Sequence, residues 1–89
     1  MILLNKYDNN FYDGEDLIEC LNRGCEVEFE YDGKKYSITH DNGNVVICEF
    51  YNENSEKVYS NVSDVLNYSI GGKKLNDIIS EMKVVDRSF

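Results

Sequence analysis

The sequence contains no proline and no tryptophan, a single histidine, and far fewer basic than acidic residues. Without proline, the tight turns must be made by glycine, asparagine and aspartate. One histidine and three cysteines with no CxxC pair leave a His/Cys metal cluster short of ligands. Nine basic residues against seventeen acidic ones argue against direct binding of nucleic acid, because phosphate binding needs clustered lysine and arginine.

Long apolar runs are also absent. The opening MILL segment is too short for a signal-peptide core or a membrane span, so we expect a cytoplasmic protein that does not contact membranes. The odd number of cysteines favours neither a disulfide framework nor a zinc site. We therefore predict that Cys20, Cys25 and Cys48 are reduced, mostly buried thiols, and that the protein uses no metal and no cofactor.

Size and charge distribution narrow the class further. A chain of 89 residues has room for only one hydrophobic core, so we predict one small domain over residues 1–89. Residues 1–49 hold eleven acidic and four basic side chains, whereas residues 50–89 hold six and five, so the first half carries nearly all of the net charge of −8. The expected partners are therefore proteins with a basic surface.

The first predicted elements are a strand plus loop over residues 1–12 and a helix over residues 14–23. Asp13 is a suitable N-cap for this helix, and Gly24 occupies the position of a left-handed C-cap. An apolar stripe at helical spacing, which should face the core, is formed by Leu17, Ile18 and Leu21.

The clearest pattern is a hairpin that begins at Cys25. Its first strand alternates apolar residues with Glu26, Glu28 and Glu30. A two-residue type I′ turn at Asp32-Gly33 fixes the register. The pairs expected on the apolar face are Tyr31 with Lys34, Phe29 with Tyr36, Val27 with Ile38 and Cys25 with His40. On the other face, Glu30 should meet Lys35, so this hairpin separates an apolar side from an anionic side.

The next strand, residues 45–51, is apolar on both faces, and its register depends on the turn before it. A three-residue loop with Gly43 in the left-handed conformation would direct Val46, Cys48 and Phe50 to the core. A two-residue Asn-Gly turn would direct Val45 and Ile47 there instead. We prefer the first register because it keeps Glu49 out of the core. Either register requires a second cover, from the N-terminal segment or from a second subunit.

The rest of the chain predicts two helices. Residues 52–58 read as a polar loop, Val62–Asn67 as a short capped helix, and residues 73–83 as a final helix with an apolar stripe. Residues 84–89 either fray or add a short strand. The predicted fold is α+β: a helix, a three-stranded antiparallel meander, then two helices packed on one face of the sheet.

The row of glutamates is the strongest candidate site. Alternate strand residues lie about 7 Å apart on one face, comparable to the separation of neighbouring phosphates along a nucleic-acid strand. Such a row can occupy the nucleic-acid-binding groove of another protein. The predicted partner-binding residues are Glu26, Glu28, Glu30, Asp32, Tyr31 and Tyr51, the two tyrosines as exposed contacts, with Glu15, Asp16 and Glu19 as an extension of the patch. The competing interpretation is a solvated strand face that prevents edge pairing.

Three weaker patterns have structural explanations. Cys25 opposite His40 resembles a thiolate–imidazole pair, but it lies near a hairpin end without oxyanion donors, so we predict no enzymatic activity. The GGKK segment at residues 71–74 lacks the spacing of a phosphate-binding loop and is interpreted as a turn between two helices. The DNGN segment at 41–44 is too short for a calcium loop.

Three segments, RGCEVEFEYDGKKYSIT, VICEFY and NVSDVLNYSIGGKKLNDII, resemble small acidic proteins of low-GC Gram-positive bacteria and their phages. That resemblance implies no established activity, but small acidic phage proteins often inhibit host defence nucleases, as anti-CRISPR proteins do. The predicted function is therefore a non-enzymatic protein-binding module that inhibits a nucleic-acid-binding host protein. The alternative is a regulatory or structural homodimer that self-associates through residues 45–51.

Overall fold

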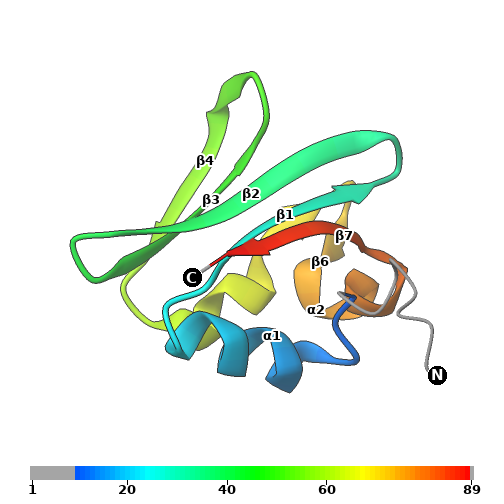
Figure 1. Ribbon diagram of the computed structural model, residues 1–89. Coiled ribbons are helices and arrows are strands. Elements are labelled where there is room, and N and C mark those ends of the chain that lie inside the picture. Colours follow the sequence, from blue (N-terminus) through cyan, green and yellow to red (C-terminus); the bar gives the residue numbers. More distant parts are fainter. Residues whose placement is uncertain (1–9, 89) are drawn as a thin grey trace, which may run out of the picture.

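The computed structural model describes residues 10–88 and has a five-stranded antiparallel sheet at its centre (Figure 1). The strand order is β4-β3-β2-β1-β7, so the first four strands follow one another as a meander and the last strand returns beside the first. The strands are β1 (Glu26–Tyr31), β2 (Lys34–Asp41), β3 (Asn44–Glu49), β4 (Asn52–Tyr59) and β7 (Lys83–Ser88). Most of the predicted strand plus loop at 1–12 lies outside the described residues.

The remaining elements lie on one face of this sheet (Figure 1). They are the helix α1 (Gly14–Asn22), the 3₁₀ helix η2 (Val62–Asn67), the hairpin strands β5 (Ser69–Ile70) and β6 (Lys73–Lys74), the one-turn helix α2 (Leu75–Ile78) and the 3₁₀ turn η3 (Ile79–Glu81). We call the face that they pack against the covered face and the opposite face the open face.

The first helix forms as predicted. The Asp13 side chain accepts a hydrogen bond of 2.9 Å from the backbone N–H of Asp16, which satisfies one of the unpaired donors of the first turn. Gly24, at φ 90°, reverses the chain after the last turn. Leu17 and Leu21 are fully buried, whereas Ile18 is only partly buried.

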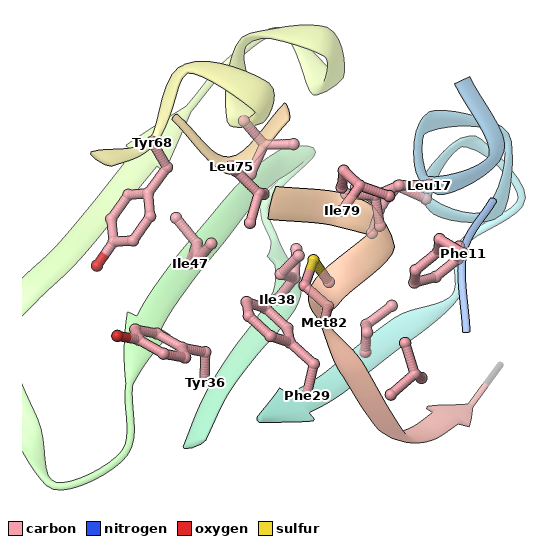
Figure 2. Close-up of a cluster of buried hydrophobic side chains, with 14 of the residues drawn as sticks. Phe11, Leu17, Phe29, Tyr36, Ile38, Ile47, Tyr68, Leu75, Ile79 and Met82 are labelled. Atoms are coloured by element: carbon pink, nitrogen blue, oxygen red, sulfur yellow. The ribbon is translucent and has the colours of Figure 1, made fainter. Parts of the chain in front are cut away.

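The β1–β2 hairpin also has the predicted register. Asp32 and Gly33 both have positive φ, at 53° and 79°, as a type I′ turn requires. Phe29 pairs with Tyr36 and Glu30 pairs with Lys35. The rings of Phe29 and Tyr36 stack with centroids 5.1 Å apart, and this stack lies in the core between the sheet and the covering helices (Figure 2).

The predicted register of β3 is wrong. Asn42 and Gly43, at φ 52° and 82°, form a two-residue turn, so Val45 and Ile47 face the core and are fully buried. The three-residue loop was preferred because it kept Glu49 out of the core. In the structure Glu49 ends the strand and is half-buried, so its inward-facing position costs little.

The predicted fold class is wrong as well, because the molecule is mostly sheet: 48% of the described residues are in strands and 28% in helices. Residues 52–58, expected as a loop, form most of the edge strand β4, which is exposed along most of its length and so has no apolar alternation. Residues 83–88 form β7, which pairs with β1 and buries Val84.

The expected helix at 73–83 is also much shorter than predicted. Gly71 and Gly72, at φ 58° and 84°, form the turn of the β5–β6 hairpin and not a turn between helices. Residues 73 and 74 are therefore extended, and α2 makes a single turn before η3. The apolar stripe is nevertheless buried as expected: Leu75, Ile78, Ile79 and Met82.

The prediction of three reduced thiols is wrong. Cys20 and Cys25 form a disulfide, with Cα atoms 5.5 Å apart, and both residues are buried. The chain reversal at Gly24 brings the last turn of α1 beside the start of β1, and the backbone N–H of Cys25 donates to the Cys20 carbonyl at 3.1 Å. Counting cysteines could not reveal this proximity, because it arises from the helix end. Cys48 is a free, half-buried thiol.

Candidate interaction surface

The open face is the part of the sheet that no helix of residues 10–88 covers (Figure 1). Its side chains alternate along the strands with the buried residues of the covered face. Cross-strand pairing arranges these side chains in short rows that run across β7, β1 and β2. The residues of these rows are Glu26, Glu28, Glu30, Lys35, Ser37, Lys83, Asp86 and Ser88.

The predicted row of glutamates therefore exists, but its three members have different surroundings. Glu30 lies between Lys35 on β2 and Lys83 on β7. Two lysines flank one glutamate in this row, although neither forms an ion pair with it, so the excess of negative charge along the face ends at Glu30. Lys35 was expected to have this effect, whereas Lys83 was not.

Glu28 has the opposite surroundings. It lies between Ser37 and Asp86, so two carboxylates face each other across neighbouring strands. No ion pair within residues 10–88 involves either carboxylate. Like charges directly opposite each other in a sheet are destabilising, by roughly 0.2–1 kcal/mol. This pair is the most anionic part of the open face.

Glu26 takes part in the hydrogen bonding of the sheet. Its carboxylate accepts a hydrogen bond of 3.2 Å from the backbone N–H of His40. The His40 ring also contacts β1's beginning, with Nε2 3.0 Å from the carbonyl oxygen of Cys25. The backbone N–H of Cys25 bonds to the end of α1, so these two side chains replace pairing that the β1–β2 ladder loses there.

The same contacts answer the question of a catalytic Cys25–His40 pair. The two residues are close, as predicted. However, the Cys25 sulfur belongs to the disulfide, and the His40 ring contacts the Cys25 carbonyl. The pair closes the end of the hairpin and offers no free thiolate.

The two predicted contact tyrosines differ. Tyr51 is fully exposed, as expected, whereas Tyr31 is half-buried and packs against the core. Tyr51 has a φ of 64°, a backbone conformation that glycine favours and that costs a side-chain-bearing residue about 1–3 kcal/mol. Its ring meets Phe50 edge to face at 6.1 Å, and the Lys35 ammonium lies 5.5 Å from the Phe50 ring centre.

The other acidic residues predicted to extend the glutamate row do not form one patch with it. Asp32 is exposed in the β1–β2 turn. Glu15, Asp16 and Glu19 belong to α1, on the covered side of the sheet. Glu15 and Glu19 instead border a groove of about 550 Å³ between α1 and η2, whose apolar part is formed by Ile18 and Leu66.

Sequence reasoning missed Asp86 and Lys83. Their strand carries a bulge between the positions that face Glu28 and Phe29, so its residues do not alternate regularly. The one usable signal was the pair Val84-Val85, two β-branched residues that suggested a short strand. Nothing in the sequence indicated that this strand would pair with β1.

No group of three or more histidine, cysteine and acidic side chains within residues 10–88 could hold a metal ion. None of the helices in that range has the length and apolar character to cross a membrane. Three comparisons with known proteins give no match: no family model, no curated protein and no solved structure is significantly similar to this chain.

Proposed function

We propose that this protein is a non-enzymatic binding module whose open face binds a basic surface on another protein. The observation that carries the proposal is the Glu28–Asp86 pair. A folding domain gains nothing from two unpaired carboxylates on adjacent strands, whereas a lysine or arginine of a partner would neutralise both.

The surroundings of this pair suit an interface. Its neighbours Ser37 and Ser88 are small and polar, so a partner side chain can approach the sheet closely. Lys35 and Lys83 at the next row repel a cation there, which would fix the register of the partner along the strand. The exposed Tyr51 lies in the β3–β4 turn, beside the same hollow as Lys35, and would supply aromatic contact area.

We further propose that the basic surface is one that normally binds nucleic acid. The carboxylates Glu26 and Glu28 follow β1 with a spacing of roughly 7 Å, comparable to that of neighbouring phosphates along a nucleic-acid strand, and Asp86 lies beside Glu28 on β7. In this role the protein would act as an inhibitor, of the kind that phages direct against host nucleases.

The test is capture from a bacterial lysate on immobilised protein, at low and at high salt, followed by elution with duplex DNA. Electrostatic binding weakens as salt rises, and a partner that uses its nucleic-acid site must be released by DNA. The double variant Glu28→Lys, Asp86→Lys should retain none of the proteins that DNA releases.

The matched control is the double variant Glu53→Lys, Glu56→Lys, which makes the same change in net charge on exposed residues of the edge strand β4. It should capture the same proteins as the natural sequence. Equal capture by both double variants, or capture that DNA does not reverse, would contradict the proposal.

Self-association is a second candidate, favoured by one observation. Val46 on β3 lies opposite Val58 on the edge strand β4, and Val58 is 54% exposed on the open face. Two copies could bury these valines against each other. Sedimentation at rising protein concentration tests this: a dimer that persists at high salt and disappears in Val58→Lys would support it, since apolar contacts do not weaken with salt.

A further inference from the structure

A second concave surface lies on the covered side of the sheet, between β2, β4 and the β5–β6 hairpin. Two adjoining hollows of about 340 and 320 Å³ share the lining residues Lys34, Tyr36, Ile70 and Gly71. We call the two hollows together the tyrosine cleft, because Tyr36 and Tyr68 form its inner wall. It has no residue in common with the carboxylate pair of the open face.

Three lysines meet at this cleft. Lys34 lines both hollows, Lys73 lines the first and Lys57 lines the second. They come from β2, β6 and β4, three elements well separated in the sequence. None of the three forms an ion pair with a carboxylate of residues 10–88. A chain with only nine basic residues therefore places three of them around these two adjoining hollows.

The tyrosine hydroxyls give the cleft hydrogen-bonding groups, and Figure 2 shows both pointing to the same side of the core. Tyr68 donates to the carbonyl oxygen of Ser55 at 2.9 Å. The Tyr36 hydroxyl has no hydrogen-bond partner within residues 10–88. No side-chain polar atom in that range is both buried and unpartnered, so the Tyr36 hydroxyl reaches the cleft although the residue is only 4% exposed.

The protonation of these hydroxyls is fixed by their surroundings. Burial, and then the nearby Glu49 carboxylate, raise the pKa of Tyr36 above its ordinary value of 10.0. Burial likewise raises the pKa of Tyr68, although its hydrogen bond to Ser55 acts in the opposite direction. Both phenols therefore keep their protons at neutral pH, and Tyr36 has a hydrogen-bond donor available to a ligand.

Two carboxylates complete the lining. Asp32 borders the first hollow and Glu49 the second, on either side of the shared portion at Lys34. Carboxylates accept hydrogen bonds from hydroxyl groups but repel a second anion. A ligand that satisfies the cleft therefore carries a compact negative group for the lysines and neutral hydroxyl groups for the carboxylates.

We propose that the tyrosine cleft binds a small hydroxylated organic phosphate, such as a sugar phosphate. Lysine ammonium groups act as point charges suited to a tetrahedral, doubly charged phosphate. The phosphate lies among Lys34, Lys57 and Lys73 and accepts a hydrogen bond from Tyr36. The hydroxyl groups of the ligand donate to Asp32 and Glu49.

The experiment is a titration of the whole chain with ribose 5-phosphate, ribose and inorganic phosphate, followed by backbone amide NMR shifts. We expect saturable shifts at Gly71 and Tyr36 with ribose 5-phosphate, weaker binding of inorganic phosphate, and none with ribose. No saturation up to about 10 mM ribose 5-phosphate would overturn the site. Equal affinity for inorganic phosphate would overturn the role given to the hydroxyl groups.

Two variants and one control locate the binding. Lys57→Gln and Lys73→Gln should each weaken binding about tenfold, as expected for the loss of a charge-assisted hydrogen bond. Lys74→Gln removes the same charge one residue further along, outside the cleft lining, and should bind as the natural sequence does. An equal loss in Lys74→Gln would show that only net charge matters and would overturn the proposal.

Tyr36→Phe adds a test that does not change the charge. It removes one hydroxyl that has no partner within residues 10–88, so the melting temperature should stay nearly unchanged while binding of ribose 5-phosphate weakens several-fold. Unchanged binding in a folded Tyr36→Phe protein would contradict the donor role of this hydroxyl.

Discussion

The covered and open faces of the sheet are built by the same strands, yet they have opposite chemistry. Phe29, Ile38 and Ile47 on the covered face are completely buried, and each alternates with open-face residues that are only half-buried. The covered face is apolar throughout its centre, whereas the open face carries the Glu28–Asp86 pair. Residues that stabilise the fold and residues free to bind a partner are therefore neighbours in sequence, separated only by the direction of the side chain.

The strongest test of this comparison is Phe29→Ala beside Glu28→Ala. Removing the Phe29 ring leaves a cavity and removes the stack on Tyr36, so we expect a loss of about 3–5 kcal/mol in the free energy of unfolding. That is a large part of the total for a small domain. Glu28→Ala should change it by no more than about 0.5 kcal/mol. Urea denaturation measures both.

Phe29→Leu keeps the experiment informative if Phe29→Ala does not fold. Its free energy of unfolding should fall by less than that of Phe29→Ala but by more than that of Glu28→Ala. Similar values for the two neighbouring positions would show that the open face is also packed against something, and the division into two faces would be wrong.

The disulfide gives the next largest expected effect. Cys20 and Cys25 are five residues apart, and closing so short a loop stabilises a fold by roughly 2 kcal/mol in the chain-entropy model. The double variant Cys20→Ala, Cys25→Ala should lose about this much, and added reductant should then have no further effect on it.

Cys48→Ala is the control for the disulfide, because that thiol is free and half-buried. It should remain as sensitive to reductant as the natural sequence. A natural protein whose unfolding curve is unchanged by complete reduction would show that the crosslink contributes no stability.

The sequence predicted the covered and open sides of the first hairpin because two local signals agreed. Alternation from Cys25 to Tyr31 gave the faces, and the Asp32-Gly33 turn gave the register. The same logic failed for β3, where both faces are apolar and alternation carries no information. The dipeptide Asn42-Gly43 favours the two-residue turn that the structure has, whereas the criterion of keeping Glu49 out of the core favours the wrong register.

The candidate site was only partly predictable for a different reason. Glu28 could be assigned to the open face from its own strand, but its partner Asp86 comes from a strand that is distant in sequence and interrupted by a bulge. Long-range pairing of this kind leaves no local pattern. The tyrosine cleft is similar, because Lys34, Lys57 and Lys73 meet only once β4 and the β5–β6 hairpin are in place.

The turn between β3 and β4 offers a test of backbone strain at Tyr51. Tyr51→Gly relieves a φ of 64°, although glycine adds entropy to the unfolded chain, so we expect a net gain of about 1 kcal/mol in the free energy of unfolding. Tyr12→Gly is the matched control: Tyr12 is 86% exposed but has no positive φ, so glycine there should reduce stability.

Losing affinity while gaining stability would mark Tyr51 as a contact residue. We expect Tyr51→Gly to retain less of the partner captured by the natural protein, since its exposed aromatic ring is gone. A destabilised Tyr51→Gly would show that the turn is not strained, and unchanged capture would remove Tyr51 from the interface.

The smallest expected effect concerns the Glu28–Asp86 pair. Replacing Glu28 with glutamine removes the repulsion without changing the shape of the side chain, so the free energy of unfolding should rise by about 0.5 kcal/mol at low salt and by less at high salt. Asp86→Asn should give a similar gain, and the double variant should give little more than either, because only one repulsion can be removed. Glu53→Gln, on the edge strand, should show no gain.

An interface residue should gain stability and lose partner binding when its charge is neutralised. If the open face is only a solvated strand face, neutralising Glu28 should leave partner binding unchanged. If Glu28→Gln instead destabilises the fold, Glu28 forms a stabilising contact and the open face has no unpaired charge to offer a partner.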